Sequence, residues 1–160
     1  MSPIQDPIRV LSHSFVVTYA DTDQMGVVYH ANYLRWFEIG RTDLLRSLGH
    51  QYRDWEARDG VFLPVLSATM EFGRPARYDD WLAVETVLTH LTAATVEFRY
   101  RVVRVTGQAP LERLTSESAA EGLATGTTRH AFVDREGRIK RVATKLLPEV
   151  FASYRSAPTS

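Results

Sequence analysis

The sequence contains no cysteine and only two lysines, Lys140 and Lys145. Without thiols the chain can form neither disulfides nor thiolate metal sites, and it has no cysteine nucleophile. The other seventeen basic residues are arginines, so guanidinium groups are abundant and a buried amine nucleophile is disfavoured. Basic and acidic residues number nineteen each, which gives a formal net charge of zero. No nucleic-acid partner is therefore expected, and an anionic ligand must be held by a local cluster of charge.

Long hydrophobic runs are missing too. Residues 1–10 carry Asp6 and Arg9 among prolines and lack the apolar stretch of a secretory signal or a membrane span. We therefore expect a cytoplasmic protein with no stable membrane insertion. At 160 residues and 44% apolar composition, the chain has the size and apolar content of one globular domain. We assign residues 1–160 to that domain and expect flexible tails at residues 1–10 and 153–160.

One long helix is predicted over about residues 29–48. Its apolar positions recur at steps of three and four residues, which is the spacing of one helix face. They are Tyr33, Phe37, Gly40, Leu44 and Leu48. Gly49 follows directly and is expected to end the helix in a left-handed conformation.

Alternating apolar and polar residues predict strands elsewhere in the chain. They cover residues 12–19, 66–72, 82–88 and 96–102, and a further strand ends in residues 127–133. Residues 106–126 could extend two strands into a long hairpin or form a short helical excursion, and the hairpin is favoured. A helix this apolar needs a curved antiparallel sheet around it, so the fold class is α+β. The edges of such a sheet would be covered by a second copy, which predicts a homodimer or homotetramer.

The common catalytic motifs are absent. The sequence contains no Gly-x-Ser-x-Gly nucleophile motif, no Walker loop and no dinucleotide-binding glycine motif. The five histidines are scattered, and no two of them have the spacing of helical metal ligands. We expect neither a metal site nor a cofactor.

A polar loop directly before the helix is the best candidate for chemistry. Asp21 and Asp23 lie two residues apart, where free backbone N–H groups and the positive end of the helix dipole converge. A carboxylate there can act as base or nucleophile while the N–H groups polarise a carbonyl, which is what acyl transfer to water requires. The alternative is that both aspartates only cap the helix or turn the chain.

The loop resembles a known family signature. Residues 19–33 read Tyr-Ala-Asp-Thr-Asp-Gln-Met-Gly-Val-Val-Tyr-His-Ala-Asn-Tyr, and Trp36-Phe37-Glu38 and Arg41 follow. This pattern is similar to that of the hotdog-fold, 4-hydroxybenzoyl-CoA thioesterase-like family, specifically over residues 15–49 and more loosely to residue 133. The resemblance implies a long central helix wrapped by a curved antiparallel sheet of about five strands. It also implies an acyl-CoA thioesterase that hydrolyses an acyl-CoA or acyl-carrier thioester to a free acid and the thiol.

The resemblance assigns roles to residues of the loop. It makes Asp23 the catalytic carboxylate, as base or nucleophile, and Asp21 an orienting or structural residue. It places the carbonyl-polarising N–H at His30, whose imidazole is either catalytic or structural, and Tyr29 is a further catalytic candidate. The expected substrate-binding residues are Gly26, Val27, Val28, Asn32, Tyr33, Arg99 and Arg101. Of these, Gly26 would let the backbone approach the thioester.

Coenzyme A carries phosphates, so a basic patch is expected despite the zero net charge. Arg99 and Arg101 alternate outward on a predicted strand, and residues 129–145 hold six basic residues against two acidic ones. For each of these arginines the alternative is a solvated, salt-bridged surface. For the whole chain the alternative is a hotdog domain that binds acyl-CoA without hydrolysis. A hydratase is less favoured, because no histidine with a carboxylate partner is evident on the helix.

Overall fold

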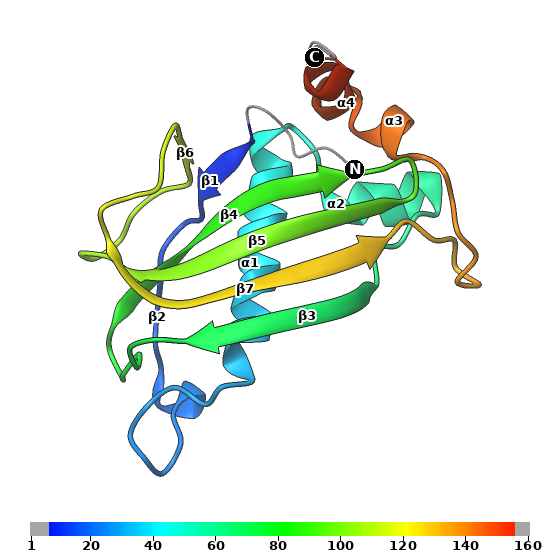
Figure 1. Ribbon diagram of the computed structural model, residues 1–160. Helices are drawn as coiled ribbons and strands as arrows, with labels where there is room; N and C mark the ends of the chain where they lie inside the picture. Colours follow the sequence, from blue (N-terminus) through cyan, green and yellow to red (C-terminus); the bar gives the residue numbers. More distant parts are fainter. Residues whose placement is uncertain (1–6, 156–160) are drawn as a thin grey trace.

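A single long helix, α1 (Asn32–Ser47), lies across one face of an antiparallel sheet in the computed structural model of the protein (Figure 1). The structure describes residues 7–155. The predicted helix is confirmed, although it begins at Asn32 because residues 29–31 form a turn instead. Gly49 ends it as expected, with φ of +84° and an N–H that donates to Arg46 O at 2.9 Å.

The sheet confirms the α+β class and contains more strands than the five expected. It is built from β1 (Arg9–Leu11), β2 (Phe15–Val16), β3 (Val65–Phe72), β4 (Trp81–Leu91), β5 (Thr95–Arg104), β6 (Glu112–Leu114) and β7 (Glu121–Ala131). The strand order is β3-β7-β5-β4-β1-β6, β2 pairs with β4, and every pairing is antiparallel. The two additional strands are β1 and β6, which have three residues each and are too short to show a period in the sequence.

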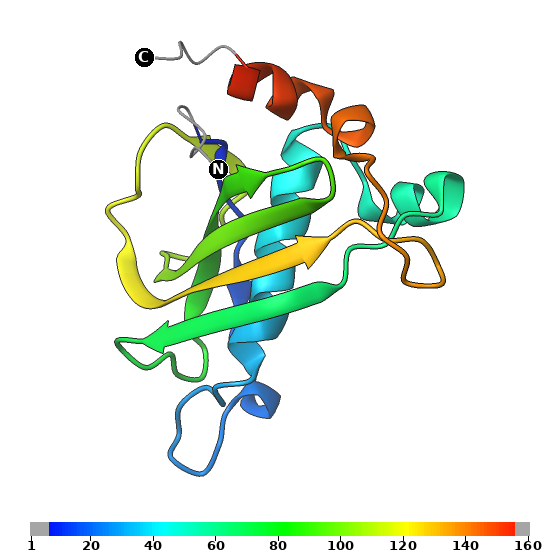
Figure 2. The same ribbon diagram turned by 45° about the vertical axis from the view of Figure 1, so that its right-hand side comes forward.

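Small helical segments complete the chain. They are η1 (Tyr19–Asp21), α2 (Tyr52–Asp54), η2 (Trp55–Asp59), α3 (Ala143–Leu146) and α4 (Pro148–Arg155). Figure 2 shows the loop that precedes α1 projecting beyond one end of the helix, while α3 and α4 lie at its other end. None of the helices within residues 7–155 has the length and apolar character needed to cross a membrane.

The first part of the chain differs from the prediction. The single strand expected over residues 12–19 is confirmed only at β2, because residues 12–14 belong to no strand and η1 replaces the end of the predicted strand. The prediction of a flexible tail over residues 1–10 is wrong for its last residues. Arg9 and Val10 belong to β1, and Val10 is fully buried. At the other terminus, residues 153–155 belong to α4. Residues 1–6 and 156–160 of the two predicted tails lie outside the described residues.

The hairpin favoured over residues 106–126 is confirmed in part: β7 begins at Glu121 and pairs antiparallel with β5, with Arg104 opposite Glu121. The intervening strand β6 does not join this hairpin, because it pairs with β1, on the far side of β4 from β5 and β7. The register joins Val10 to Arg113, about a hundred residues along the chain. Two segments so far apart in the sequence show no local pattern from which their pairing could be predicted.

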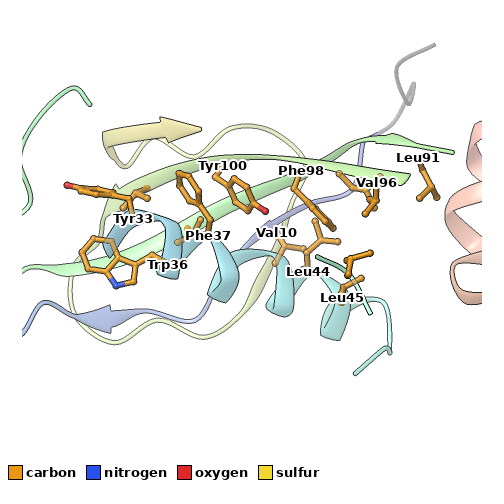
Figure 3. Packing of buried hydrophobic residues seen from close by; sticks show 14 of the residues in the cluster. Val10, Tyr33, Trp36, Phe37, Leu44, Leu45, Leu91, Val96, Phe98 and Tyr100 are labelled. Atoms are coloured by element: carbon orange, nitrogen blue, oxygen red, sulfur yellow. The ribbon is translucent and has the colours of Figure 1, made fainter. Parts of the chain in front are cut away.

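The apolar face of α1 packs on the central strands (Figure 3). Phe37 stacks on Tyr100 of β5, with ring centroids 4.3 Å apart and an interplanar angle of 6°. Leu44 and Trp36 are buried on the same helix. This packing fixes the position of the helix start, and therefore of the candidate loop, against the sheet.

Gly40 is where α1 approaches the sheet most closely. A Cβ at this position would lie 2.3 Å from Thr86 Oγ1 and 2.8 Å from Val84 Cγ1. The Thr86 hydroxyl is itself buried, and it has no hydrogen-bond partner within the described residues. Only a glycine therefore allows this helix-to-sheet distance.

We expect Gly40→Ala to lower the free energy of unfolding by about 1–3 kcal/mol, because the added methyl group overpacks the interface. In an exposed helix the same change would raise the free energy of unfolding by about 1 kcal/mol. A decrease would therefore show that the methyl group overpacks the interface. Urea unfolding measures the change. The double variant Gly40→Ala/Thr86→Ala should recover part of the loss, and a stabilised single variant would contradict the packing argument.

Candidate active site

Residues 22–28 form a tight loop ahead of α1. Thr22 and Val28 pair as an antiparallel bridge, and the Asp23 N–H donates to Val27 O at 2.9 Å. The Gly26 N–H donates to Asp23 O at 3.0 Å, and Gly26 has φ of +74°. A Cβ at Gly26 would meet no atom within 4 Å, so the glycine is required by its backbone conformation. The backbone hydrogen bonds define where the Asp23 carboxylate lies.

Asp21 holds the loop to its surroundings, and both of its carboxylate oxygens already accept hydrogen bonds. It is buried; one carboxylate oxygen accepts from the Thr18 N–H and hydroxyl, both at 2.9 Å, and the other pairs with Arg35. Its carbonyl accepts from the Tyr29 N–H at 2.8 Å and from Asn32 Nδ2 at 2.9 Å. Asp21 therefore occupies the orienting position that the resemblance implies.

Asp23 is different, because half of its carboxylate is unoccupied. Oδ1 accepts from the Met25 N–H at 2.8 Å, and within the described residues Oδ2 has no hydrogen-bond partner. The side chain is only partly buried. Of the two loop aspartates, Asp23 is thus the one whose carboxylate can accept a proton from water or attack a carbonyl.

Free backbone donors lie at the start of α1. The N–H groups of Asn32 and Tyr33 donate to Tyr29 O and His30 O, at 3.0 and 3.3 Å. Those of His30 and Ala31 have no acceptor among residues 7–155, as expected ahead of a helix. A developing oxyanion at this end would meet free donors and the positive end of the helix dipole.

The side chains around these donors divide into exposed and buried groups. Tyr29 and His30 are exposed, and their rings lie 4.5 Å apart between centroids. Tyr33 is buried against Trp36 and Phe72, and burial raises the pKa of its hydroxyl. Tyr33 is therefore a core residue. It is linked to the candidate site only by its position next to the loop.

Two further loop residues behave differently from one another. Val27 is partly exposed, whereas Val28 lies in the core with its N–H donating to Ala76 O at 2.9 Å. The prediction that Val28 contacts substrate is not supported by this position, because both its side chain and its N–H are occupied. Packing against the 73–80 segment fixes it there.

The two arginines predicted to bind phosphate do not lie near the loop. Arg99 and Arg101 point to the sheet face opposite α1, since their neighbours Phe98 and Tyr100 are buried under the helix. Arg101 contacts the buried Glu85 through Nε and Nη2, at 3.0 and 3.1 Å, and donates to Ser118 O at 2.6 Å. Its guanidinium is committed to these contacts, so its position does not support the phosphate role predicted for it. Arg99 is exposed and makes no ion pair within residues 7–155.

The second predicted basic cluster, residues 129–145, is partly neutralised. Arg138 pairs with Asp134 at 2.7 Å and with Glu136 at 3.3 Å, and Lys145 lies 3.9 Å from Asp59. Among the described side chains no group of three histidines, aspartates or glutamates could hold a metal ion.

A groove of about 440 Å³ adjoins the loop on the β2 side of α1. Phe15, Trp36 and Ile39 form its apolar wall, and the Asp21–Arg35 pair lies on its polar side. The groove gives a ligand access to the helix start, although its two charged groups, Asp21 and Arg35, already form an ion pair with each other.

These features define a class of protein. A long helix packed on an antiparallel sheet is the arrangement of a hotdog-fold domain, and in this chain a half-free carboxylate and free N–H donors lie at the start of that helix. Residues 17–154 match the family model of the thioesterase-like superfamily. The chain therefore belongs to that superfamily, as the loop signature indicated.

Individual relatives agree with this assignment. The chain is 32% identical over 150 residues to "Putative acyl-CoA thioesterase YneP" of Bacillus subtilis, covering 94% of this chain and 99% of that protein. It resembles the DHNA-CoA thioesterase of Staphylococcus aureus with a TM-score of 0.73 and 24% identity, over 91% and 89% of the two chains. It resembles a mutant 4-hydroxybenzoyl CoA thioesterase solved with 4-hydroxybenzoyl CoA with a TM-score of 0.68 and 20% identity, over 88% and 97%. The two structures establish the hotdog fold.

Proposed function

We propose that the protein is an acyl-CoA thioesterase that hydrolyses a thioester to a free acid and CoA. The observation that carries this proposal is the pairing, at one end of α1, of a half-free Asp23 carboxylate with the unoccupied N–H groups of His30 and Ala31. Family membership and the name of the Bacillus subtilis relative support it. In this proposal the acyl group is carried either by CoA or by an acyl-carrier protein.

Asp23 would start the reaction in one of two ways. As a general base it takes a proton from water while the water oxygen attacks the thioester carbon; as a nucleophile it attacks that carbon directly and water later hydrolyses the anhydride. In both routes the carbonyl oxygen becomes an oxyanion, which the His30 N–H stabilises. The C–S bond then breaks, and the thiolate of CoA leaves and takes up a proton. Tyr29 and the His30 imidazole, which are exposed and lie next to each other at the start of the helix, would orient the water or the carbonyl.

A hydrolysis panel tests the proposal. Purified protein is mixed with acyl-CoAs of different chain lengths, and released thiol is followed with a thiol reagent. The chain has no cysteine, so the protein itself contributes no background to this assay. Turnover of at least one acyl-CoA supports the proposal. An inert panel combined with a CoA-dependent rise in Tm would favour the non-catalytic acyl-CoA-binding domain instead.

We also propose that the protein self-associates through β3. This strand pairs only with β7 within the described chain and forms one edge of the sheet. Phe72 packs edge-on against Tyr33 of α1 and Met70 contacts the core, yet Leu66 and Phe72 are each 53% exposed. A long apolar edge strand is a template for pairing with a second chain. A homodimer built this way is the unit from which a homotetramer could form.

Leu66→Asp is expected to convert the dimer to a monomer, because it places a charge in the paired edge. Light scattering coupled to size-exclusion chromatography measures the mass. Ile139→Asp is the matched control, since Ile139 is 59% exposed and lies outside the strands. A monomeric parent protein, or a Leu66→Asp variant with unchanged mass, would contradict the β3 interface.

A further inference from the structure

A second pocket lies beside the middle of α1 and shares no lining residue with the groove next to Asp21. It is lined by Glu38, Arg41, Thr42, Leu45, Tyr52 and Leu63, and its volume is about 240 Å³. Pockets for whole drug-sized ligands span about 300–1,000 Å³. This one has room for the end of a ligand and not for all of it.

Arg41 is the cation of this pocket, and it has no acidic partner. The side chain is half-buried, and within residues 7–155 it forms no ion pair, although Glu38 lines the same pocket. Two other partly buried arginines are paired: Arg101 with Glu85, and Arg104 with Asp80. A half-buried guanidinium without a counter-ion is costly unless a ligand supplies one.

A buried chain of hydroxyls leads from Arg41 into the sheet. Tyr100 Oη lies 2.5 Å from Thr128 Oγ1, which lies 2.7 Å from His130 Nε2. His130 Nδ1 lies 3.1 Å from Leu63 O. Burial, and then the nearby Arg41 charge, lower the pKa of His130 to about 4, so its ring is neutral at pH 7.

Neutral His130 fixes the direction of every hydrogen bond in this chain. Only an N–H can face Leu63 O, so Nδ1 carries the proton and Nε2 must accept from the Thr128 hydroxyl. Thr128 then accepts from the Tyr100 hydroxyl, and Tyr100 Oη is left to accept a hydrogen bond from Arg41. The network therefore holds the guanidinium in place without bringing it any negative charge.

The distance from the helix start limits what can reach Arg41. Arg41 is nine residues into α1 from Asn32, and its side chain reaches Tyr100, whose ring stacks on Phe37, five residues into the helix. At about 1.5 Å per residue the guanidinium therefore lies roughly 7.5–13.5 Å along the helix from its start. An extended chain covers about 1.2 Å per bond, so about six to eleven carbons span the gap from a carbonyl held at His30.

We propose that this pocket binds a carboxylate at the far end of the acyl group, so that the preferred substrates are monothioesters of dicarboxylic acids with about six to eleven carbons. The inference rests on the proposed thioesterase function and adds its substrate class. A carboxylate matches the planar donor array of Arg41 and supplies the missing counter-ion. The groove on the β2 side is less suited to this group, because its arginine is already paired with Asp21.

The unmodified protein provides the first test. Adipoyl-CoA and hexanoyl-CoA have the same number of acyl carbons and differ in the terminal carboxylate. We expect kcat/KM to be at least roughly tenfold higher for adipoyl-CoA, from the strength of charge-assisted hydrogen bonds. An equal or higher kcat/KM for hexanoyl-CoA would overturn the proposal.

Arg41 variants test the residue. Arg41→Gln should lower the adipoyl-to-hexanoyl ratio of kcat/KM by roughly tenfold to a hundredfold, mainly through KM for adipoyl-CoA, and Arg41→Lys should lower it less. Arg53→Gln is the matched control, since Arg53 is exposed in α2 and lies outside the pocket. A ratio that is unchanged in folded Arg41→Gln would overturn the assignment.

A binding measurement separates this proposal from the thioesterase proposal. Free adipate should raise the Tm of the unmodified protein, hexanoate should not, and Arg41→Gln should abolish the shift. If adipate binds in this way while no acyl-CoA is hydrolysed, the pocket stands and the thioesterase function fails. If acyl-CoAs are hydrolysed while adipate gives no shift, the function stands and the pocket proposal fails.

Discussion

Replacing Asp23 with asparagine is expected to lower kcat for acyl-CoA hydrolysis by roughly 10²–10⁴-fold, the usual contribution of a general base. Asparagine has the same shape, and its carbonyl oxygen can still accept the Met25 N–H that holds Oδ1. The charge is lost, and with it the ability to take a proton or to attack the carbonyl. Steady-state kinetics on the best substrate of the panel measure the effect, and CoA binding should stay measurable.

Two neighbouring variants make this result specific. Gln24→Ala changes the next residue of the loop, which is exposed, and should leave kcat within a few-fold. Asp21→Asn removes the partner of Arg35 and should reduce Tm, because Asp21 holds the loop together. If Asp23→Asn kept the kcat of the unmodified protein, Asp23 would not be the catalytic carboxylate.

The helix was predictable from sequence because its period is long and uninterrupted. Apolar residues at Tyr33, Phe37 and Leu44 identify one face over four turns, and Gly49 marks its end through backbone conformation alone. The strands β4, β5 and β7 were predictable for the same reason, since each has ten or eleven residues. β1 and β2 have three and two residues, and such segments are defined only by their partners in the sheet.

The loop could be located from sequence, but without the structure only the family resemblance distinguished the two aspartates. Local pattern places both ahead of the helix; the structure shows that Thr18 and Arg35 occupy Asp21 and leave Asp23 half free. The Arg41 pocket was missed as a site. Its supporting groups, Tyr100 and Thr128, are 28 residues apart in sequence and meet only because β5 and β7 are neighbours.

The contacts of Arg101 could not be predicted from sequence for a related physical reason. An arginine that alternates outward on a strand has the same local pattern whether it faces solvent or an acidic partner. Glu85 lies directly opposite on β4, and the segment around Ser118 covers both side chains. The Glu85 carboxylate is thereby 1% exposed, and it depends on Arg101 and the Ser118 N–H for its hydrogen bonds.

Arg101→Met is therefore expected to destabilise the fold by about 3–5 kcal/mol, the cost of leaving a buried charge without its partner. Urea unfolding followed by tryptophan fluorescence measures the loss. Arg99→Met is the matched control: it lies on the same strand and face but is exposed, and it should change stability by less than about 0.5 kcal/mol. A folded Arg101→Met protein within about 0.5 kcal/mol of the parent would contradict the structural role.

The double variant Glu85→Met/Arg101→Met distinguishes a structural arginine from a ligand-binding one. Removing both charges leaves no buried ion without a partner, so stability should recover most of the loss and could exceed that of the parent. If Arg101 serves only the fold, the double variant should also bind CoA with the affinity of the parent protein. Normal stability combined with a weakened affinity for CoA would instead return Arg101 to the phosphate-binding role first predicted for it, and would place the nucleotide on the sheet face opposite α1.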